Sequence, residues 1–362
     1  MDVREFDFEL PPELIAQEPT GDRSAARLLH LDRATGSVSH TNVTALPDLL
    51  RAGDLLVVNN TRVFPARLLG HRVPTGGAVE CLLVARVGTD PGPSPIRPRS
   101  VRTVEVWEAL MHPGQKLKPG ARVVFEGLHT LDGEVLERRF YGRRLIRLWT
   151  KDGSTVDEAI DAIGHVPLPP YIKRDDRPAD RDRYQTIFAA ARGSVAAPTA
   201  GLHFGPPLVQ ALAARGVQIV SITLHVGYGT FQPVRVDRVE DHHVEAERYE
   251  VSDAAAAAIN RALDEQRRVV AVGTTTTRTL ESVGAAHDGR IAAATGVTDL
   301  FIYPGFRFRV IGGLLTNFHL PRSSLLMLVA AFGGREAVLA AYHAAITARY
   351  RFYSYGDAML VV

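Results

Sequence analysis

Hydrophobic and polar residues alternate with a period of two from about residue 66 to residue 151. The pattern is clearest in four segments: GAVECLLVARV (77–87), RTVEVWEAL (102–110), ARVVFEG (121–127) and RRLIRLW (143–149). Such alternation is typical of strands with one buried face. Turn-rich pieces at 88–100 and 112–120 separate the segments. The pattern predicts a compact all-β unit such as a small barrel.

A different pattern begins near residue 157, where strand-like and helix-like segments alternate. Apolar runs at 217–226 and 269–273 predict buried strands. Helices are predicted at 251–268 with Ser252 as N-cap, at 277–283, at 323–334 and at 335–350. This alternation indicates an α/β domain built on a largely parallel sheet.

The apolar run at 54–60 resembles the strands of this later region. We therefore predict that the β unit, residues 67–150, is inserted into a discontinuous α/β domain made of residues 1–66 and 151–362. The chain of 362 residues is long enough for two such domains.

Composition narrows the class of protein. The chain is 46% hydrophobic, and its 42 basic and 40 acidic side chains leave a net charge of +2, which gives no sign of nucleic-acid binding. The longest apolar run, 325–332, is too short to span a bilayer, and residues 1–19 lack the order of a signal peptide. The single cysteine, Cys81, excludes internal disulfides and cysteine-based metal cages. We expect a soluble cytoplasmic protein without a membrane partner, and we favour a monomer although the sequence fixes no oligomeric state.

A row of four threonines beginning with Thr274 and Thr275 follows a predicted strand through Gly273. The first N–H groups of a helix starting there favour a carboxylate or a phosphate. Arg278 and Glu281 lie three residues apart on one face of that helix. The alternative, which the sequence leaves equally open, is a threonine-capped helix with a solvated Arg–Glu pair.

Further polar residues stand at the ends of predicted strands, where α/β folds place their sites. His203 ends a run of small residues that contains Thr199, and we weigh it against a simple packing role. Glycines at 227 and 229 resemble a Rossmann loop, but a third glycine is missing and Pro233 interrupts the helix, so we reject that loop. The other candidates are His225, Tyr228, Thr230, Asn317, His319 and Asp299. Asp299 lies in an apolar strand-like run and needs a partner there, so it is equally well a structural hydrogen-bond hub or a ligand-binding carboxylate.

Metal binding is not indicated, because none of the 13 histidines has convincing ligand spacing. The nearest approach is DHHVEAE at 241–247, which is weak as a bare cluster.

Two basic stretches are candidates for RNA binding. Residues 138–151 hold six basic side chains and no acid, with Phe140, Tyr141 and Trp149 between them. Basic and aromatic side chains together suit a single-stranded RNA loop, although a solvated sheet face explains the same pattern. In residues 171–186, acidic residues nearly cancel the charge. The residues selected are Arg143, Arg144, Arg147, Lys173 and Arg174.

The chain closely resembles the S-adenosylmethionine:tRNA ribosyltransferase-isomerases of queuosine biosynthesis. The resemblance rests on FDFELPPELIAQEP, GDLLVVNNTRVFPARL, PLPPYIKR, GSVAAPTAGLHF, LHVGYGTFQPV, VGTTTTRTLES, TDLFIYPGFRF, LLTNFHLPRSSLLMLVAAFGG and RFYSYGDAML, in the family's order from Phe6 to Leu360. One departure is Glu245, where the family pattern leads us to expect a second histidine.

The resemblance implies a reaction in which the ribosyl part of S-adenosylmethionine is transferred to 7-aminomethyl-7-deazaguanine at the tRNA wobble position and isomerised. Epoxyqueuosine-tRNA, adenine and methionine are the implied products. The chemistry implied begins with removal of a proton from the 5′ carbon beside the sulfonium. It requires a base and an acid but no metal or resident cofactor, because S-adenosylmethionine is consumed.

The resemblance also implies an α/β barrel-like catalytic domain interrupted by a small β-barrel, and the anticodon loop of tRNA as partner. Of the three histidines His203, His225 and His319, we favour His203 as the base, with the other two orienting substrate. The remaining candidates at strand ends, the threonines Thr274 and Thr275, and Arg278 and Glu281 of the helix that follows are expected to bind substrate. Two alternatives are an S-adenosylmethionine-dependent RNA methyltransferase and a non-enzymatic RNA-binding protein.

Overall fold

The computed structural model describes residues 1–89, 104–231 and 234–362. It divides into two compact units. The first contains residues 1–62, 169–174 and 182–362, and the second contains residues 63–168 and 175–181. The second unit is wider than the predicted insertion, because it includes the chain on both sides of residues 67–150.

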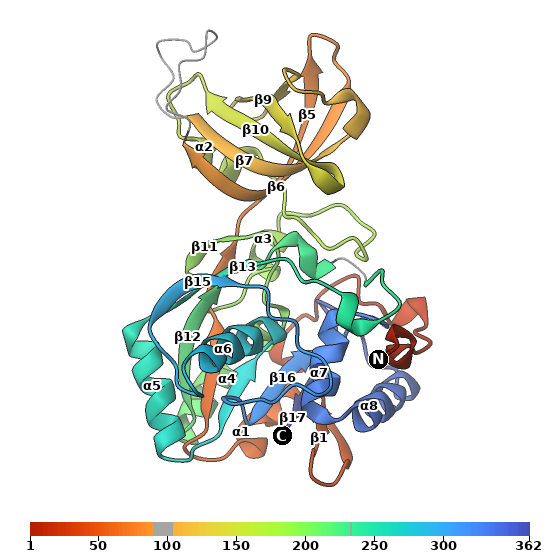
Figure 1. Cartoon of the computed structure of the whole chain (residues 1–362), viewed down its shortest axis with the longest axis vertical. Helices are drawn as coiled ribbons and strands as arrows, with labels where there is room; N and C mark the ends of the chain where they lie inside the picture. Colours follow the sequence, from red (N-terminus) through yellow and green to blue (C-terminus); the bar gives the residue numbers. More distant parts are fainter. Residues whose placement is uncertain (90–103, 232–233) are drawn as a thin grey trace. The chain divides into compact units, whose positions relative to one another are not determined.

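A nine-stranded sheet forms the centre of the first unit (Figure 1). Its strands, in order across the sheet, are β15 (Ala294–Thr298), β13 (Glu247–Val251), β12 (Gln218–Leu224), β3 (Leu55–Asn59), β14 (Val269–Val272), β16 (Gly313–Asn317), β17 (Ala358–Val361), β1 (Arg27–Leu31) and β2 (Val38–Asn42). The strands β12, β3, β14 and β16 run parallel, as do β17 and β1, whereas the other neighbours are antiparallel. The sheet is therefore mixed. The prediction of a largely parallel sheet holds for the strands from β12 to β16, but it was wrong for the outer strands and for the pair β16–β17 inside the sheet.

Helices cover both faces of this sheet. They are α1 (Leu46–Leu49), α4 (Pro206–Ala214), α5 (Asp253–Asp264), α6 (Thr274–Ala286), α7 (Ser324–Gly333) and α8 (Arg335–Thr347). Because successive strand residues point to opposite faces, Leu55 and Val57 of β3 join one core cluster, and Leu56 and Val58 join another. The first cluster includes side chains of α5, α6, α7 and α8, and the second includes side chains of α1 and α4.

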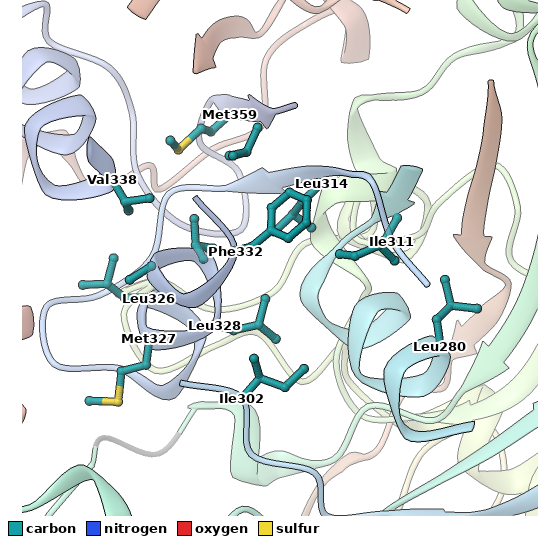
Figure 2. Close-up of a cluster of buried hydrophobic side chains, with 14 of the residues drawn as sticks. Leu280, Ile302, Ile311, Leu314, Leu326, Met327, Leu328, Phe332, Val338 and Met359 are labelled. Atoms are coloured by element: carbon teal, nitrogen blue, oxygen red, sulfur yellow. The ribbon is translucent and has the colours of Figure 1, made fainter. Parts of the chain in front are cut away.

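Figure 2 shows the first cluster at the centre of the unit, where α6, α7 and α8 contribute side chains against β16 and β17. Its labelled members are Leu280, Ile302, Ile311, Leu314, Leu326, Met327, Leu328, Phe332, Val338 and Met359. All are buried. This packing holds the ends of β14 and β16 beside the first turns of α6 and α7.

The predicted helices are present, but α5 and α8 end earlier than predicted and α6 is longer. Ser252 and Ser323 cap α5 and α7 through hydrogen bonds to backbone N–H groups. Helix α6 begins at Thr274, earlier than predicted, so the four threonines lie inside the helix. Thr276 and Thr277 donate their hydroxyls to the carbonyls of Val272 and Gly273, at 2.8 and 3.1 Å. A threonine that bonds back to the preceding turn satisfies its hydroxyl in a buried helix.

The second unit contains a closed six-stranded barrel (Figure 1). Its strands, in order, are β10 (Arg143–Thr150), β7 (Val104–His112), β6 (Ala78–Thr89), β5 (Arg67–Val73), β8 (Arg122–Phe125) and β9 (Leu131–Arg138). The four predicted segments became β6, β7, β8 and β10. Strands β5 and β9 were missed, since glycine and charged residues interrupt their alternation. The predicted fold class, an α/β domain with an inserted all-β barrel, is confirmed. The α/β domain itself was expected to be barrel-like, whereas its nine described strands form a mixed sheet that ends at β15 and β2.

Helix α2 (Val156–Ile163) follows the barrel and belongs to the same compact unit. Thr155 and Glu158 form a capping box at its start, and Val156, Ala159 and Ile160 are buried. The remaining short elements are α3 (Asp180–Arg183) and a two-stranded sheet of β4 (Thr61–Val63) and β11 (Ala191–Ser194). Among the described residues, no single helix is long and apolar enough to cross a membrane; α7 and α8 reach that length and composition only when counted together, with a bend of 114° between them.

Candidate functional site

A cavity in the first unit opens where β14 and β16 end and α6 and α7 begin. It encloses about 750 Å³ of empty space, part of which is open to solvent. Its lining consists of Tyr171, residues 196–200, Val226, residues 273–275, residues 316–320, Ser323, Leu325, Tyr353 and Ser354. The carboxyl ends of neighbouring parallel strands are where α/β folds bind ligands.

The first turn of α6 forms one wall of the cavity. Gly273 precedes the helix with φ of 94°, a conformation that favours glycine, and donates its N–H to the carbonyl of Leu315 at 2.8 Å. No described side chain caps the helix, so the threonine-cap alternative was wrong. Thr274 and Thr275 line the cavity. Uncapped N–H groups and two hydroxyls at a helix N-terminus suit a carboxylate or a phosphate.

Asn317 lies at the centre of a buried hydrogen-bond network at the end of β16. Its Nδ2 donates to the carbonyl of Tyr353 at 3.0 Å and to Nε2 of His203 at 3.2 Å. Its Oδ1 is buried and has no hydrogen-bond partner among the described residues. Both amide hydrogens are thus used, and Oδ1 is left as an acceptor on a residue that lines the cavity.

His203 stands behind Asn317 and lines an adjoining hollow rather than the cavity itself. Burial lowers the pKa of His203 to about 4, so the ring is neutral near pH 7. In accepting from Asn317, its Nε2 uses the lone pair that a base needs. The favoured sequence candidate for the base is therefore engaged in holding Asn317.

His319 lines the cavity directly. Its Nε2 lies 2.8 Å from Oγ1 of Thr316, and burial lowers its pKa to about 3. If Nε2–H donates to Thr316, the lone pair of Nδ1 stays available. Its backbone N–H donates to the hydroxyl of Tyr342 at 3.0 Å, which fixes the position of the residue.

Two tyrosines far apart in the sequence stack at the cavity wall. The rings of Tyr171 and Tyr353 have centroids 4.4 Å apart and planes inclined by 19°. The hydroxyl of Tyr171 lies 2.5 Å from Oγ of Ser354, whereas the buried hydroxyl of Tyr353 has no partner among the described residues. Sequence reasoning missed all three residues. The available signal was their position inside two of the stretches that carry the family resemblance.

The other strand-end candidates are placed less centrally. His225 contacts Oγ1 of Thr61 through Nδ1 at 2.9 Å, and it adjoins the lining residue Val226 without lining the cavity. Burial lowers the pKa of His225. Tyr228 is half-buried in a short 3-10 helix, and the side chain of Thr230 lies outside the described residues. Thr199 lines the cavity.

Asp299 was expected in a strand and in need of a partner. The structure corrects this expectation, because β15 ends at Thr298 and Asp299 is exposed in the loop that follows. An exposed carboxylate is solvated and requires no buried partner.

Arg278 and Glu281 are buried, and their side chains bind other groups of the protein. The guanidinium of Arg278 donates to the carbonyl of Leu300 at 2.9 Å and pairs with the buried carboxylate of Glu247. Glu247 in turn accepts the N–H of Gly227 at 2.8 Å. Arg278 therefore fixes the loop after β12, and its prediction as a ligand partner is corrected.

Glu281 accepts the backbone N–H groups of three residues in the segment that leads to β16, namely Arg309, Val310 and Ile311, at 2.8 to 3.1 Å. Burial raises its pKa, and these hydrogen bonds act in the opposite direction. The solvated Arg–Glu pair that the sequence left open was also wrong.

The arginines selected for RNA binding lie on the barrel strand β10 and are less exposed than expected. Arg144 is 3% exposed, and its guanidinium donates to the carbonyls of Gly114, Leu117, Gly142 and Arg143 at 2.7 to 3.1 Å. A buried side chain with this many acceptors is structural, which corrects its selection.

Arg143 and Arg147 are half-buried beside Glu108 and Glu134, at 3.1 and 3.5 Å. In the first unit, Lys173 is exposed, and Arg174 pairs with Glu18 at 3.0 Å. RNA binding by these four residues stays a prediction. Among the described residues, no group of three or more His, Cys, Asp or Glu side chains is placed to hold a metal ion.

A family profile described as "Queuosine biosynthesis protein" matches residues 3–361. The chain belongs to this family. It is 50% identical to the S-adenosylmethionine:tRNA ribosyltransferase-isomerase of Desulfitobacterium hafniense and 49% identical to that of Heliobacterium modesticaldum, with 100% of both chains covered in each case. The crystal structure of the S-adenosylmethionine tRNA ribosyltransferase from Thermotoga maritima is similar with a TM-score of 0.54 and 36% identity, over 99% of this chain and 100% of that one.

The cavity lies where the stretches that resemble the family come together. Each of its lining residues lies in one of the stretches on which the resemblance to the family rests. These stretches are far apart along the chain, and the fold brings them to one place.

Proposed function

We infer that this chain is an S-adenosylmethionine:tRNA ribosyltransferase-isomerase. It transfers the ribosyl part of S-adenosylmethionine to 7-aminomethyl-7-deazaguanine at the wobble position of tRNA and isomerises it, giving epoxyqueuosine-tRNA, adenine and methionine. The observation that carries this inference is the convergence of the family stretches on the cavity at the ends of β14 and β16. The full-length similarity to proteins of that name supports it.

The cavity suggests where S-adenosylmethionine binds. We propose that the first turn of α6, with Thr274 and Thr275, receives the methionine carboxylate, because uncapped helix N–H groups favour an anion. We propose that Oδ1 of Asn317 accepts a hydrogen bond from an amino or hydroxyl group of the substrate. A buried acceptor without a partner costs about 1–3 kcal/mol, which a bound donor would recover.

For the base, geometry favours His319 over His203. A base must lie within hydrogen-bond reach of the proton it removes and must be unprotonated near pH 7. Both histidines are neutral, since burial lowers both pKa values, but His319 lines the cavity and His203 is engaged with Asn317. We propose that His319 removes the 5′ proton and that His203 positions Asn317. We further propose that S-adenosylmethionine is consumed and that no resident cofactor takes part.

The test is product analysis after incubation with S-adenosylmethionine and tRNA that carries the aminomethyl-deazaguanine base. We expect adenine and methionine to be released and the mass of the tRNA to rise. The control is the same tRNA without the modified base, for which no release is expected. S-adenosylhomocysteine as product would identify a methyltransferase, and binding without products would identify an RNA-binding protein.

A further inference from the structure

A second hollow in the first unit adjoins the cavity and contains two arginines. Its lining includes Thr20, Arg23, Arg183, His203, Ser354 and Tyr355. Arg23 lies in a short 3-10 helix near the N-terminus, and Arg183 is the last residue of α3. Both side chains are half-buried. Two segments about 160 residues apart thus bring two guanidiniums to one place.

Backbone carbonyls hold both guanidiniums in position. Arg23 donates to the carbonyl of Asp182 at 2.7 Å and to that of Leu202 at 3.4 Å. Arg183 donates to the carbonyl of Gly21 at 3.0 Å and to that of Thr20. These hydrogen bonds orient the two guanidinium groups, but the carbonyls carry no charge that would neutralise them.

The hollow carries uncompensated positive charge. Neither arginine forms an ion pair with another described residue, in contrast to Arg27, Arg268 and Arg278 of the same unit. The nearby carboxylate of Asp22 is exposed and accepts the N–H and hydroxyl of Ser24. Burial, followed by the charge of Arg183, lowers the pKa of Arg23. Two like charges in a half-buried place are stabilised by an anion that both can contact.

The hollow is connected to the cavity through two residues. Ser354 lines both spaces, and His203, which lines the hollow, is hydrogen-bonded to Asn317 of the cavity. An anion beside Arg23 and Arg183 therefore lies next to the cavity.

We propose that Arg23 and Arg183 form a binding pocket for a backbone phosphate of the tRNA, beside the nucleotide whose base enters the cavity. The proposal rests on the proposed function. A phosphate has enough oxygen atoms to accept hydrogen bonds from two guanidinium groups. The carboxylate of S-adenosylmethionine is proposed to bind elsewhere, at the first turn of α6. Such a contact positions the RNA and reads no base.

The test is the salt dependence of tRNA binding to the double variant Arg23→Gln/Arg183→Gln. Glutamine can still donate to the backbone carbonyls but carries no charge. We expect binding to weaken about tenfold and the slope of log K against log salt to decrease by about 0.7–0.9, the value for one phosphate contact. Affinity for S-adenosylmethionine should be unchanged.

The matched control is Arg215→Gln/Arg267→Gln. These arginines belong to the same unit and also donate to backbone carbonyls, those of Pro47 and Gly53, but each has a carboxylate partner and so differs in the property under test. The control removes the same charge but should leave the slope unaltered. An unaltered slope in the folded Arg23/Arg183 variant overturns the proposal, and so does a loss of affinity for S-adenosylmethionine with unaltered tRNA binding.

If the double variant does not fold, the proposal is tested on the wild-type protein by chemical modification of its arginines with and without tRNA. Bound tRNA should shield Arg23 and Arg183, but not Arg215, from modification by phenylglyoxal, as measured by mass spectrometry. Absence of this protection overturns the proposal. A wild-type protein that binds tRNA and protects both arginines, yet releases no adenine, contradicts the proposed function alone.

Discussion

Asn317 donates its amide hydrogens to His203 and to the carbonyl of Tyr353, and its Oδ1 has no partner among the described residues. This arrangement fixes the orientation of the amide, because a flipped Asn317 would place its oxygen against the carbonyl of Tyr353. The histidine that the sequence favours as a base is thus hydrogen-bonded to Asn317, a residue that lines the cavity. The roles of His203 and His319 can be separated by experiment.

The variant His319→Gln should lower turnover at least 100-fold, because a positioned general base typically contributes 10²–10⁴-fold. It should also stop exchange of the 5′ hydrogens of S-adenosylmethionine with solvent deuterium, while tRNA binding remains. The comparison is His203→Gln, whose side-chain oxygen can still accept from Asn317, and which should stay within about tenfold of wild type. A larger loss of turnover in His203→Gln than in His319→Gln would show that His203 is the base.

The variant Arg278→Ala should be destabilised by about 3–5 kcal/mol, since it leaves the buried carboxylate of Glu247 without its partner. Urea unfolding measures this loss. The matched variant is Thr275→Val, which keeps the shape of the helix wall at the cavity. It should raise the required concentration of S-adenosylmethionine with little change in stability. A stable Arg278→Ala protein with weakened substrate binding would show that Arg278 is a ligand residue after all.

The variant Arg144→Gln should lower the free energy of unfolding by about 2–4 kcal/mol, because several buried carbonyls lose a charged donor. The slope of log K against log salt for tRNA binding should not change, as the guanidinium is buried. Arg122 in β8 is exposed and serves as control, with Arg122→Gln expected within about 0.5 kcal/mol of wild type. A reduced salt slope in Arg144→Gln would contradict the structural role.

Acid should destabilise the protein through its buried histidines. Burial lowers the pKa of His203 to about 4 and that of His319 to about 3, whereas an unfolded histidine titrates near 6.5. Between these values the unfolded state binds more protons, so the free energy of unfolding falls as the pH is lowered from about 6.5 toward 4. Each histidine contributes up to about 1.4 kcal/mol per pH unit.

Urea unfolding between pH 6 and pH 5 checks this pH dependence. The variant His319→Gln should make the dependence shallower by about that amount. His343→Gln changes an exposed histidine of α8 and should leave the dependence as in wild type. Equal dependence in wild type and His319→Gln would show that His319 is not buried as a neutral ring.

The sequence determined those features whose causes lie within a few residues. Strands β6, β7, β8 and β10 follow from their alternation, and the starts of α5 and α7 follow from Ser252 and Ser323. The family stretches also indicated the segments of the site, and each residue that lines the cavity falls in one of them. The hydrophobic period and the helix caps depend on residues close in sequence. They can therefore be recognised without knowing which distant segments pack together in the fold.

The partners of charged and aromatic side chains were decided by the tertiary structure alone. Arg278 meets Glu247 and Tyr171 stacks on Tyr353 only because the sheet order brings distant segments together. The direction of neighbouring strands was likewise hidden, since a buried strand has the same apolar pattern beside a parallel or an antiparallel neighbour. Whether an arginine binds a ligand or a buried glutamate depends on what lies within a few ångströms of its guanidinium. That distance is set by the folded chain and leaves no local mark in the sequence.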